Sequence, residues 1–256
     1  MPLKNRGNYG YIGIYYLGAA NDEETGCYGG ELQPIRMILD TGSANSWVVS
    51  NLAVPDNGDF TPFDPSLSCH FEEPAEEDRQ NTRITFGSGH LNGYFVKDDV
   101  TIGNIESSNL SDRLSMPEYT FGMVNEQTCF QPSFDAIVGL AYPEFAEPNV
   151  IPFFDHMMET DILRDNMFAF FMSLNDEEEE SEVMFGSYDQ DRIDPDYNEG
   201  TGDLDCHDVL HKLFWSIKLD DIKINGESLH LCDDKECLFT PDTGTSLITF
   251  PSWATA

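Results

Sequence analysis

Residues 38–43 read Ile-Leu-Asp-Thr-Gly-Ser, and residues 239–246 read Phe-Thr-Pro-Asp-Thr-Gly-Thr-Ser. The two stretches share an Asp-Thr-Gly tripeptide, and each tripeptide follows a segment rich in β-forming residues. A single Asp-Thr-Gly carries little information, because the tripeptide suits any turn. Two copies in one chain, each followed by Ser or Thr and then by apolar residues, indicate an internal repeat of one structural unit.

The repeat supplies one carboxylate from each copy, Asp40 and Asp242. Two carboxylates held close together cannot both ionise, so they share one proton and their pKa values separate. The ionised member then acts as a general base toward water, and the protonated member acts as a general acid. Hydrolysis of a peptide bond by water needs both of these groups, so we expect Asp40 and Asp242 to be catalytic.

The residues that follow each aspartate fit such a pair. They are Thr41, Gly42 and Ser43 in the first copy and Thr243, Gly244 and Thr245 in the second. We expect the two threonine hydroxyls at the second position to lock the loops to each other. The glycines allow close backbone approach and bring their N–H groups to the carboxylates. The hydroxyls at the fourth position are placed to bind the outer carboxylate oxygens.

Short β-rich runs recur along the chain, separated by turn residues. They are Tyr11–Leu17, Ile35–Leu39, Trp47–Ser50, Arg83–Phe86, Tyr94–Val96, Phe168–Leu174 and Trp215–Leu219. Gly and Pro punctuation at this spacing predicts an all-β fold of sandwich or barrel type. One helix is expected to start at Pro152 and run to about Ile162, because the apolar residues after the proline are spaced to form one buried face.

The charge of the chain limits its partners. It has 13 Lys and Arg against 47 Asp and Glu, a formal net charge of −34 at pH 7. A negative field of this size repels phosphate, so we expect no nucleic-acid partner and no anionic membrane surface. Self-repulsion falls as carboxylates protonate, which fits an acidic compartment, although solubility alone explains the same charge. No run of about 18 apolar residues is present, so we expect no membrane span.

Six cysteines permit three disulfides without fixing their pairing: Cys27, Cys69, Cys129, Cys206, Cys232 and Cys237. The last two are close enough in sequence to close a local loop. A zinc site is the alternative, with Cys206, His207, His211, Cys232 and Cys237 as its donors. Their spacing matches no compact zinc site, and zinc leaves the Asp-Thr-Gly repeat unexplained. We therefore expect neither a metal nor a cofactor.

Two stretches that contain the repeat, and a third between them, carry a resemblance to a known family. They are residues 40–50, Asp-Thr-Gly-Ser-Ala-Asn-Ser-Trp-Val-Val-Ser; residues 134–143, Phe-Asp-Ala-Ile-Val-Gly-Leu-Ala-Tyr-Pro; and residues 242–249, Asp-Thr-Gly-Thr-Ser-Leu-Ile-Thr. Together they resemble the active-site segments of the pepsin-like (A1) aspartic endopeptidases, the family of pepsin, cathepsin D and the plasmepsins. The resemblance runs from Tyr11 to the end of the chain.

The resemblance implies the pepsin-like acid protease fold, with two β-rich lobes and a substrate cleft between them. It also implies one catalytic Asp from each lobe, a bound water as nucleophile, and a peptide or protein substrate. A monomer in a secreted or acidic endolysosomal or vacuolar location is expected on the same ground. The N-terminus, Met1 to Arg6, lacks the apolar stretch of a secretory signal.

The family resemblance also assigns the substrate-binding positions. Residues 83–89, Arg-Ile-Thr-Phe-Gly-Ser-Gly, resemble the hairpin flap that closes over substrate, with Phe86, Gly87 and Ser88 as flap residues. Trp47 matches the tryptophan that packs near the flap, while Ile137 and Trp215 are expected at the cleft. A place in the core is the alternative for each tryptophan. Cys232 and Cys237 lie where the family has a small disulfide loop ahead of the second aspartate.

Four features depart from the family pattern. Phe86 stands where the flap usually carries a tyrosine, so a hydroxyl is missing. Pro241 precedes the second aspartate where a residue with an N–H is usual. Residues 51–60 contain no cysteine for the disulfide expected there, and residues 19–30, with Cys27, form an insertion.

The expected lobes are unequal. Residues 1–170 are predicted to form the N-terminal lobe with the first Asp-Thr-Gly and the flap, and residues 171–256 a partial C-terminal lobe with the second. Ile137-Val138-Gly139 follows the first aspartate and is expected to support its loop, but no apolar-apolar-Gly segment follows Asp242. We therefore expect a C-terminally truncated second lobe and an inactive, poorly stable chain. The alternative function is an inactive homologue that binds peptide or a partner protein.

Overall fold

The computed structural model describes residues 1–53, 60–86, 89–107, 109, 112–128, 134–197 and 204–254. Its strands are β1 Pro2–Asn5, β2 Tyr11–Leu17, β3 Gln33–Asp40, β4 Trp47–Val49, β5 Thr82–Phe86, β6 Gly89–Gly103, β7 Arg113–Thr128, β8 Ala136–Gly139, β9 Phe168–Phe171, β10 Ser181–Phe185, β11 Ile217–Leu219, β12 Lys223–Ile224, β13 Glu227–Ser228 and β14 Cys237–Phe239. The α-helix in these residues is α1, Phe153–Glu159. The short 3-10 helices are Pro65–Leu67, Glu76–Asp78, Pro143–Phe145, Gln190–Arg192 and Ser252–Ala254.

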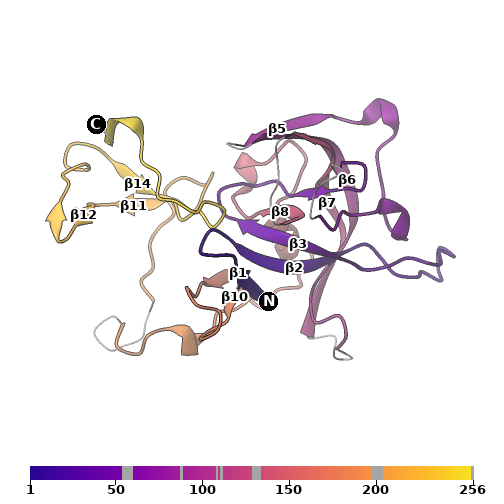
Figure 1. The fold of residues 1–256 in the computed structure, drawn as a ribbon, viewed down its shortest axis with the longest axis horizontal. Coiled ribbons are helices and arrows are strands. Elements are labelled where there is room, and N and C mark those ends of the chain that lie inside the picture. The colour runs from indigo at the N-terminus through magenta and orange to yellow at the C-terminus, as the bar shows by residue number, and fades with distance from the viewer. Residues whose placement is uncertain are drawn as a thin grey trace.

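Ten of these strands form one strongly curled sheet, in the order β5-β6-β7-β4-β8-β3-β2-β1-β10-β9. The long strand β6 also pairs with β2, which closes the middle of the sheet into a barrel. Most neighbours are antiparallel, but β3 runs parallel to β8 and β4 parallel to β7. Figure 1 shows this sheet on the right, with the N-terminus at its lower edge.

The core of the barrel comes from the alternating pattern of its strands. In β3, Ile35, Met37 and Leu39 are buried, and the residues between them are more exposed. Helix α1 covers one side of the sheet, with Phe153 and Met157 fully buried. Because β3 is anchored along its whole length by these side chains, its last residue, Asp40, has a fixed position.

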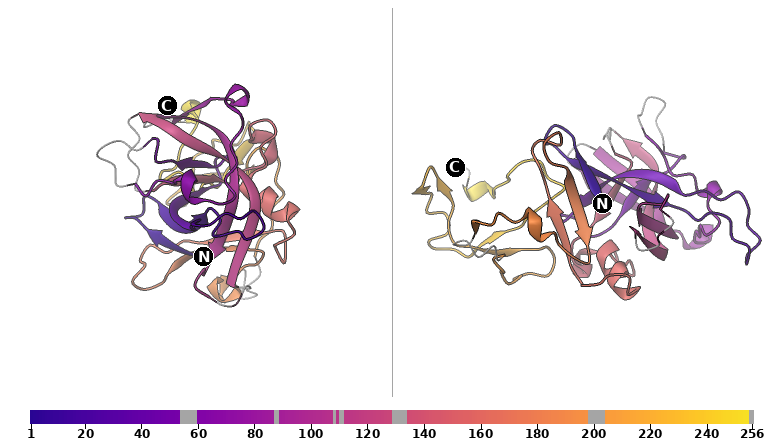
Figure 2. Two further views of the ribbon diagram at one scale, coloured as in Figure 1. Left: turned by 90° about the vertical axis from the view of Figure 1, so that its right-hand side faces the viewer. Right: turned by 90° about the horizontal axis from the view of Figure 1, so that it is seen from below.

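The C-terminal part forms two small sheets, β11 with β14 and β12 with β13. They lie at one end of the elongated molecule, and the loop after β14 runs back toward the large sheet (Figures 1 and 2). Strand β10 pairs with β1, so residues 181–185 lie in the large sheet although they follow the expected boundary at residue 170. The division into two lobes stays a proposal.

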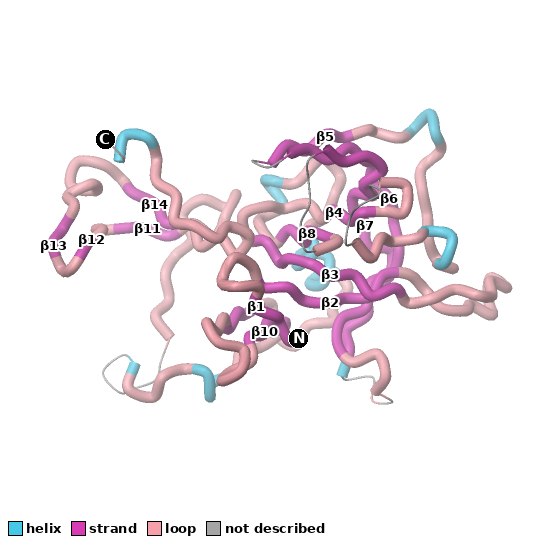
Figure 3. Tube along the Cα trace, viewed as in Figure 1, coloured by secondary structure: helices cyan, strands magenta, loops and turns pink. Residues whose placement is uncertain are grey.

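The fold confirms the all-β prediction, and Figure 3 shows how little of the chain is helical. The expected strand at 11–17 has the predicted bounds. The expected run at 94–96 is the middle of the much longer β6, and the strand predicted to reach Leu174 ends at Phe171. The helix is shorter than predicted, since Pro152 caps it from outside and it ends at Glu159. The helices of the described residues are all too short to span a bilayer.

Candidate active site

The two Asp-Thr-Gly loops approach each other from different sheets. Asp40 is the last residue of β3, and Asp242 follows β14 by three residues. Both loops turn tightly, with the Ser43 N–H bonded to the Asp40 carbonyl and the Thr245 N–H bonded to the Asp242 carbonyl, each at 3.4 Å. The predicted repeat is therefore present in the backbone as well as in the sequence.

Thr41 and Thr243 join the loops with reciprocal hydrogen bonds. The Thr41 N–H donates to Oγ1 of Thr243, and the Thr243 N–H donates to Oγ1 of Thr41, both at 3.0 Å. Each hydroxyl then donates across the interface, from Thr41 to the Pro241 carbonyl at 2.7 Å and from Thr243 to the Leu39 carbonyl at 2.6 Å. These four bonds fix the loops as one unit.

The two carboxylates are held in matching ways. Oδ1 of Asp40 accepts the N–H of Gly42 at 2.9 Å, and its Oδ2 accepts the Ser43 hydroxyl at 2.5 Å. Asp242 accepts the Gly244 N–H at 2.9 Å and the Thr245 hydroxyl at 2.7 Å on its two oxygens. Each carboxylate thus uses donors of its own loop, as the sequence predicted, and its orientation is set by them.

Each carboxylate lies against the glycine of the opposite loop. A Cβ placed on Gly42 would lie 2.6 Å from Cγ of Asp242, and one on Gly244 would lie 2.2 Å from Oδ1 of Asp40. Any side chain at either position would collide with the partner carboxylate. The glycines are therefore required because they let the two aspartates come together.

The environment of Asp40 favours its protonated form. Burial raises the pKa of Asp40, and the neighbouring Asp242 carboxylate raises it further, while the bonds from Ser43 and Gly42 act in the opposite direction. A carboxyl with a raised pKa beside a second carboxylate is the arrangement that shares one proton between two groups.

Strand β8 supports the first loop from beneath. It pairs with β3 so that Gly139 stands opposite Asp40, and the Leu140 N–H donates to the Asp40 carbonyl at 2.9 Å. The Ala141 N–H donates to the Ser43 carbonyl, also at 2.9 Å. The segment 137–139 therefore lies where the sequence placed it, beside the loop of the first aspartate.

A buried ion pair fixes the start of β8, and no sequence motif pointed to it. The Asp135 carboxylate is fully buried and accepts two bonds from the Arg36 guanidinium, at 2.8 and 2.9 Å. It also accepts the Arg36 N–H at 3.1 Å and the Thr61 N–H at 2.8 Å. Positions 36 and 135 are 99 residues apart, so only the β3–β8 pairing reveals that they meet.

Pro241, which departs from the family pattern, removes no hydrogen bond from the strand pairing. Strand β14 ends at Phe239, so the missing N–H of the proline falls outside the strand pairing. Its carbonyl accepts the Thr41 hydroxyl. Pro241 thus contributes an acceptor to the loop interface, and its lack of a donor removes no ladder bond.

Of the expected flap residues, Phe86 belongs to an antiparallel hairpin of β5 and β6, in which it pairs with Gly89. Gly87 and Ser88 lie outside the described residues. Trp47 and Ile137 are buried in one apolar cluster that includes Leu91 of this hairpin. The ring of Trp47 lies 5.1 Å from that of Phe95. The hairpin and the two predicted cleft residues are thus brought together, and the role of each in substrate binding stays a prediction.

Trp215 lies against the large sheet. Its indole N–H donates to the Leu140 carbonyl at 2.8 Å, and its ring packs on Tyr142 and Phe168 with centroid distances of 4.5 and 5.3 Å. This placement ties the C-terminal part to the segment that follows Gly139. The predicted place of Trp215 at the cleft stays a prediction.

The cysteines are partly paired. Cys232 and Cys237 form a disulfide, as the sequence predicted, and Cys27 pairs with Cys69. Cys206 is exposed with a free thiol, and Cys129 lies outside the described residues. The zinc alternative is wrong in the form considered, because two of its five donors are bonded to each other.

The sequence profile of the family described as eukaryotic aspartyl protease matches residues 28–256. The chain belongs to this family. Its paired Asp-Thr-Gly loops, locked by threonines, are therefore those of a pepsin-like aspartyl protease.

Several curated relatives are similar to the chain over most of its length. Pepsin II-1 of Oryctolagus cuniculus is 36% identical over 87% of this chain and 52% of its own length. Cathepsin E-B of Xenopus laevis is 32% identical, with 94% and 55% covered, and pepsin A of Sus scrofa is 32% identical, with 100% and 58% covered. The chain thus spans little more than half the length of the relatives that it matches.

Proposed function

We propose that this aspartyl protease chain carries the catalytic pair of an endopeptidase, with Asp40 and Asp242 sharing one proton and activating a water molecule. The observation that carries the proposal is the mutual packing of each carboxylate on the glycine of the other loop. Aspartic proteases are the standard example of two carboxyl groups that share a proton in this way.

The proposed reaction starts with one carboxylate of the pair taking a proton from water, which attacks the carbonyl carbon of the peptide bond. The other carboxyl, still protonated, donates to the carbonyl oxygen. The C–N bond then breaks as the nitrogen takes up the proton that came from water. At the same time one hydroxyl of the tetrahedral intermediate returns a proton to the other carboxylate, which leaves the pair singly protonated. Asp40 suits the protonated role at rest because burial raises its pKa.

The substrate class follows from the family and from the hairpin. We propose peptides or unfolded proteins, bound under the β5–β6 hairpin as a flap, with Trp47 and Ile137 at the cleft. A secreted or acidic endolysosomal location is proposed on family resemblance and suits a chain whose net charge of −34 is partly neutralised in acid. Binding of peptide without cleavage is the alternative function.

The test is acid cleavage of a quenched fluorescent peptide by the purified chain and by the longest natural product that contains it. Asp40→Asn and Asp242→Asn should each abolish cleavage, because the shared proton needs both partners. The matched control is Asp234→Asn, at an exposed aspartate outside both Asp-Thr-Gly loops, which should leave cleavage unchanged.

Two results would separate the alternatives. If either catalytic-pair variant retains more than a small fraction of turnover, the assignment of the pair is wrong. If the chain binds a transition-state-mimicking peptide inhibitor and neither protein form cleaves the substrate, the peptide-binding function is the correct one.

A further inference from the structure

The insertion at residues 19–30 is attached to the rest of the molecule at its base and near its tip. At the base, the Cys69 N–H donates to the Ala19 carbonyl at 3.2 Å, and the Ala19 N–H donates to the Ser68 hydroxyl at 2.9 Å. Farther out, a disulfide joins Cys27 to Cys69. Residues 68–70 are therefore the strip of chain on which the insertion is held.

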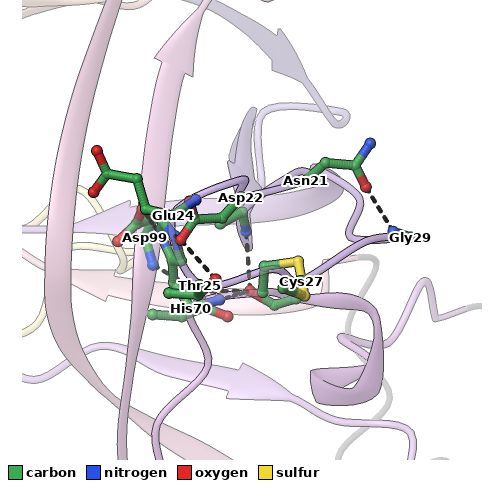
Figure 4. Close-up of a disulfide and its surroundings, with 12 residues drawn as sticks. Asn21, Asp22, Glu24, Thr25, Cys27, Gly29, His70 and Asp99 are labelled. Atoms are coloured by element: carbon green, nitrogen blue, oxygen red, sulfur yellow. Dashed lines mark hydrogen bonds and ion pairs between the residues drawn. A yellow bond between two sulfur atoms is a disulfide. The ribbon is translucent and has the colours of Figure 1, made fainter.

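His70 adds a second attachment beside the disulfide, and Figure 4 shows the two together. Its Nδ1 lies 2.7 Å from Oδ2 of Asp99 in β6, and its Nε2 lies 3.3 Å from Oδ2 of Asp22 in the insertion. One imidazole thus stands between two carboxylates from different parts of the chain. A neutral imidazole donates from one nitrogen only, so both contacts become hydrogen bonds only when the ring is protonated.

Asp98, next to Asp99, supports the same strip from below. It is fully buried, and its Oδ1 accepts the Ser68 hydroxyl and the Asp99 N–H, both at 2.8 Å. Its Oδ2 is also buried and meets no donor in the described part of the chain. An ionised carboxylate with one buried oxygen lacking a donor is destabilising, and protonation relieves this.

We propose that the insertion is fastened by a pH-sensitive clasp, closed in acid by protonated His70 between Asp22 and Asp99 and by neutral Asp98 under Ser68. Toward neutral pH the clasp loosens, and the Cys27–Cys69 disulfide keeps the loosened insertion tethered. The inference goes beyond the proposed function and uses none of the residues assigned to catalysis.

Other charged residues on the neighbouring elements do not cancel this effect. Those nearest the clasp include Glu24 of the insertion, Glu72 after His70, Lys97 of β6 and Glu118 of β7. The one cation among them, Lys97, faces Glu118 at 3.9 Å. The histidine is therefore the cation in direct contact with the two bridging carboxylates.

The titrations of His70 and Asp98 change the stability of the clasp in the same direction. The hydrogen bond with Asp99 raises the pKa of His70, so the stability that His70 adds is complete below pH 6.5, its ordinary value, and is lost as pH rises through the raised pKa. Burial raises the pKa of Asp98 from 3.8 to about 6, so the folded protein loses stability between those two values. Asp98 weakens the clasp as pH rises from 3.8 to about 6, and His70 weakens it above pH 6.5, so both changes act in the same direction.

Hydrogen exchange of residues 19–31 tests the clasp on the chain with its disulfides intact. Rates at pH 4.5 and 7.5 are corrected with an unstructured reference peptide, and protection in the wild type should be severalfold higher at pH 4.5. His70→Gln should lower protection at pH 4.5 and reduce the difference between the two pH values to the part that Asp98 contributes. Asp98→Asn, which imitates the neutral acid, should raise protection at pH 7.5.

The control is His230→Gln. His230 contacts Asp233 at 2.9 Å in an exposed pair with no second carboxylate among the described residues, so this variant should keep the wild-type pH difference. Equal corrected protection of the wild type at both pH values overturns the proposal. So does a full wild-type difference in His70→Gln, which lies at the surface and leaves the core intact. Neither result depends on cleavage activity.

Discussion

Thr41 and Thr243, 202 positions apart, each accept the backbone N–H of the other through the side-chain hydroxyl at 3.0 Å. The relationship is symmetric, and it joins the loop that follows β3 of the large sheet to the loop that follows β14 of a small sheet. Asp40 and Asp242 each lie next to one of these threonines. The bonds between the threonines therefore determine how far apart the two carboxylates lie.

Replacing Thr243 tests this coupling. Thr243→Val removes the acceptor for Thr41 and the donor to Leu39, and each bond contributes about 0.5–1.5 kcal/mol. Displacement of a catalytic group by about 1 Å can cost a hundredfold in rate. In the longest natural product that contains the chain, we expect kcat of Thr243→Val to fall about ten- to a hundredfold, while Thr243→Ser, which keeps the hydroxyl, stays within a few fold. Equal losses in both variants would contradict the role of the hydroxyl.

The glycines of the two loops make a second prediction. Gly244→Ala places a methyl group 2.2 Å from Oδ1 of Asp40 if nothing moves, so the loops must separate. Activity should fall below detection while the barrel, which the loop does not build, keeps its unfolding midpoint within a few degrees. Gly10→Ala is the control, because its added Cβ meets nothing closer than 3.6 Å. Normal activity in Gly244→Ala would show that the loops are not packed as described.

The pH dependence of cleavage follows from the state of Asp40. Because burial and the nearby Asp242 raise its pKa, the singly protonated pair persists to higher pH than a lone aspartate would allow. Cleavage should be fastest in acid and decline as pH rises and the shared proton is lost. A profile of kcat/KM against pH measures this, and an optimum at neutral pH would contradict the shared-proton assignment.

Trp215 offers a test that separates packing from substrate binding. Trp215→Phe keeps an aromatic ring against Tyr142 and Phe168 and removes the bond to the Leu140 carbonyl. We expect a loss of about 1 kcal/mol, or roughly 2–4 °C in Tm. If KM also rises severalfold, the predicted place of Trp215 at the cleft is supported; an unchanged KM assigns the residue to packing alone.

The Arg36–Asp135 pair should be one of the most sensitive positions of the barrel. Arg36→Met leaves a fully buried carboxylate with only backbone donors, and breaking one side of a buried pair costs about 3–5 kcal/mol. Urea unfolding at neutral pH measures the loss. The double variant Arg36→Met with Asp135→Leu should recover part of it, since the unpaired charge is gone. A loss below about 1 kcal/mol in the single variant would show that the pair contributes little.

Much of the site could be read without a structure. The repeat predicted which carboxylates meet and which hydroxyls and glycines bind them, because all these groups lie within a few residues of each motif. The family resemblance and the short distance in sequence predicted that Cys232 pairs with Cys237. The strand at 11–17 could be read for a similar local reason, since its β-forming residues are bounded by turn residues. Residues that interact with near neighbours in the chain can be recognised from a short stretch of sequence.

The sequence by itself therefore determined the all-β class, the family and the paired aspartates. Only the tertiary structure decided that Arg36 lies on Asp135, that Trp215 lies against the large sheet, and that His70 stands between Asp22 and Asp99. Each of these contacts joins segments that are distant in the chain, and single residues such as Arg36 or His70 look like ordinary surface residues until strand pairing brings their partners near. The register of β3 on β8 and the path of the insertion are set by packing over the whole barrel, which no short motif records.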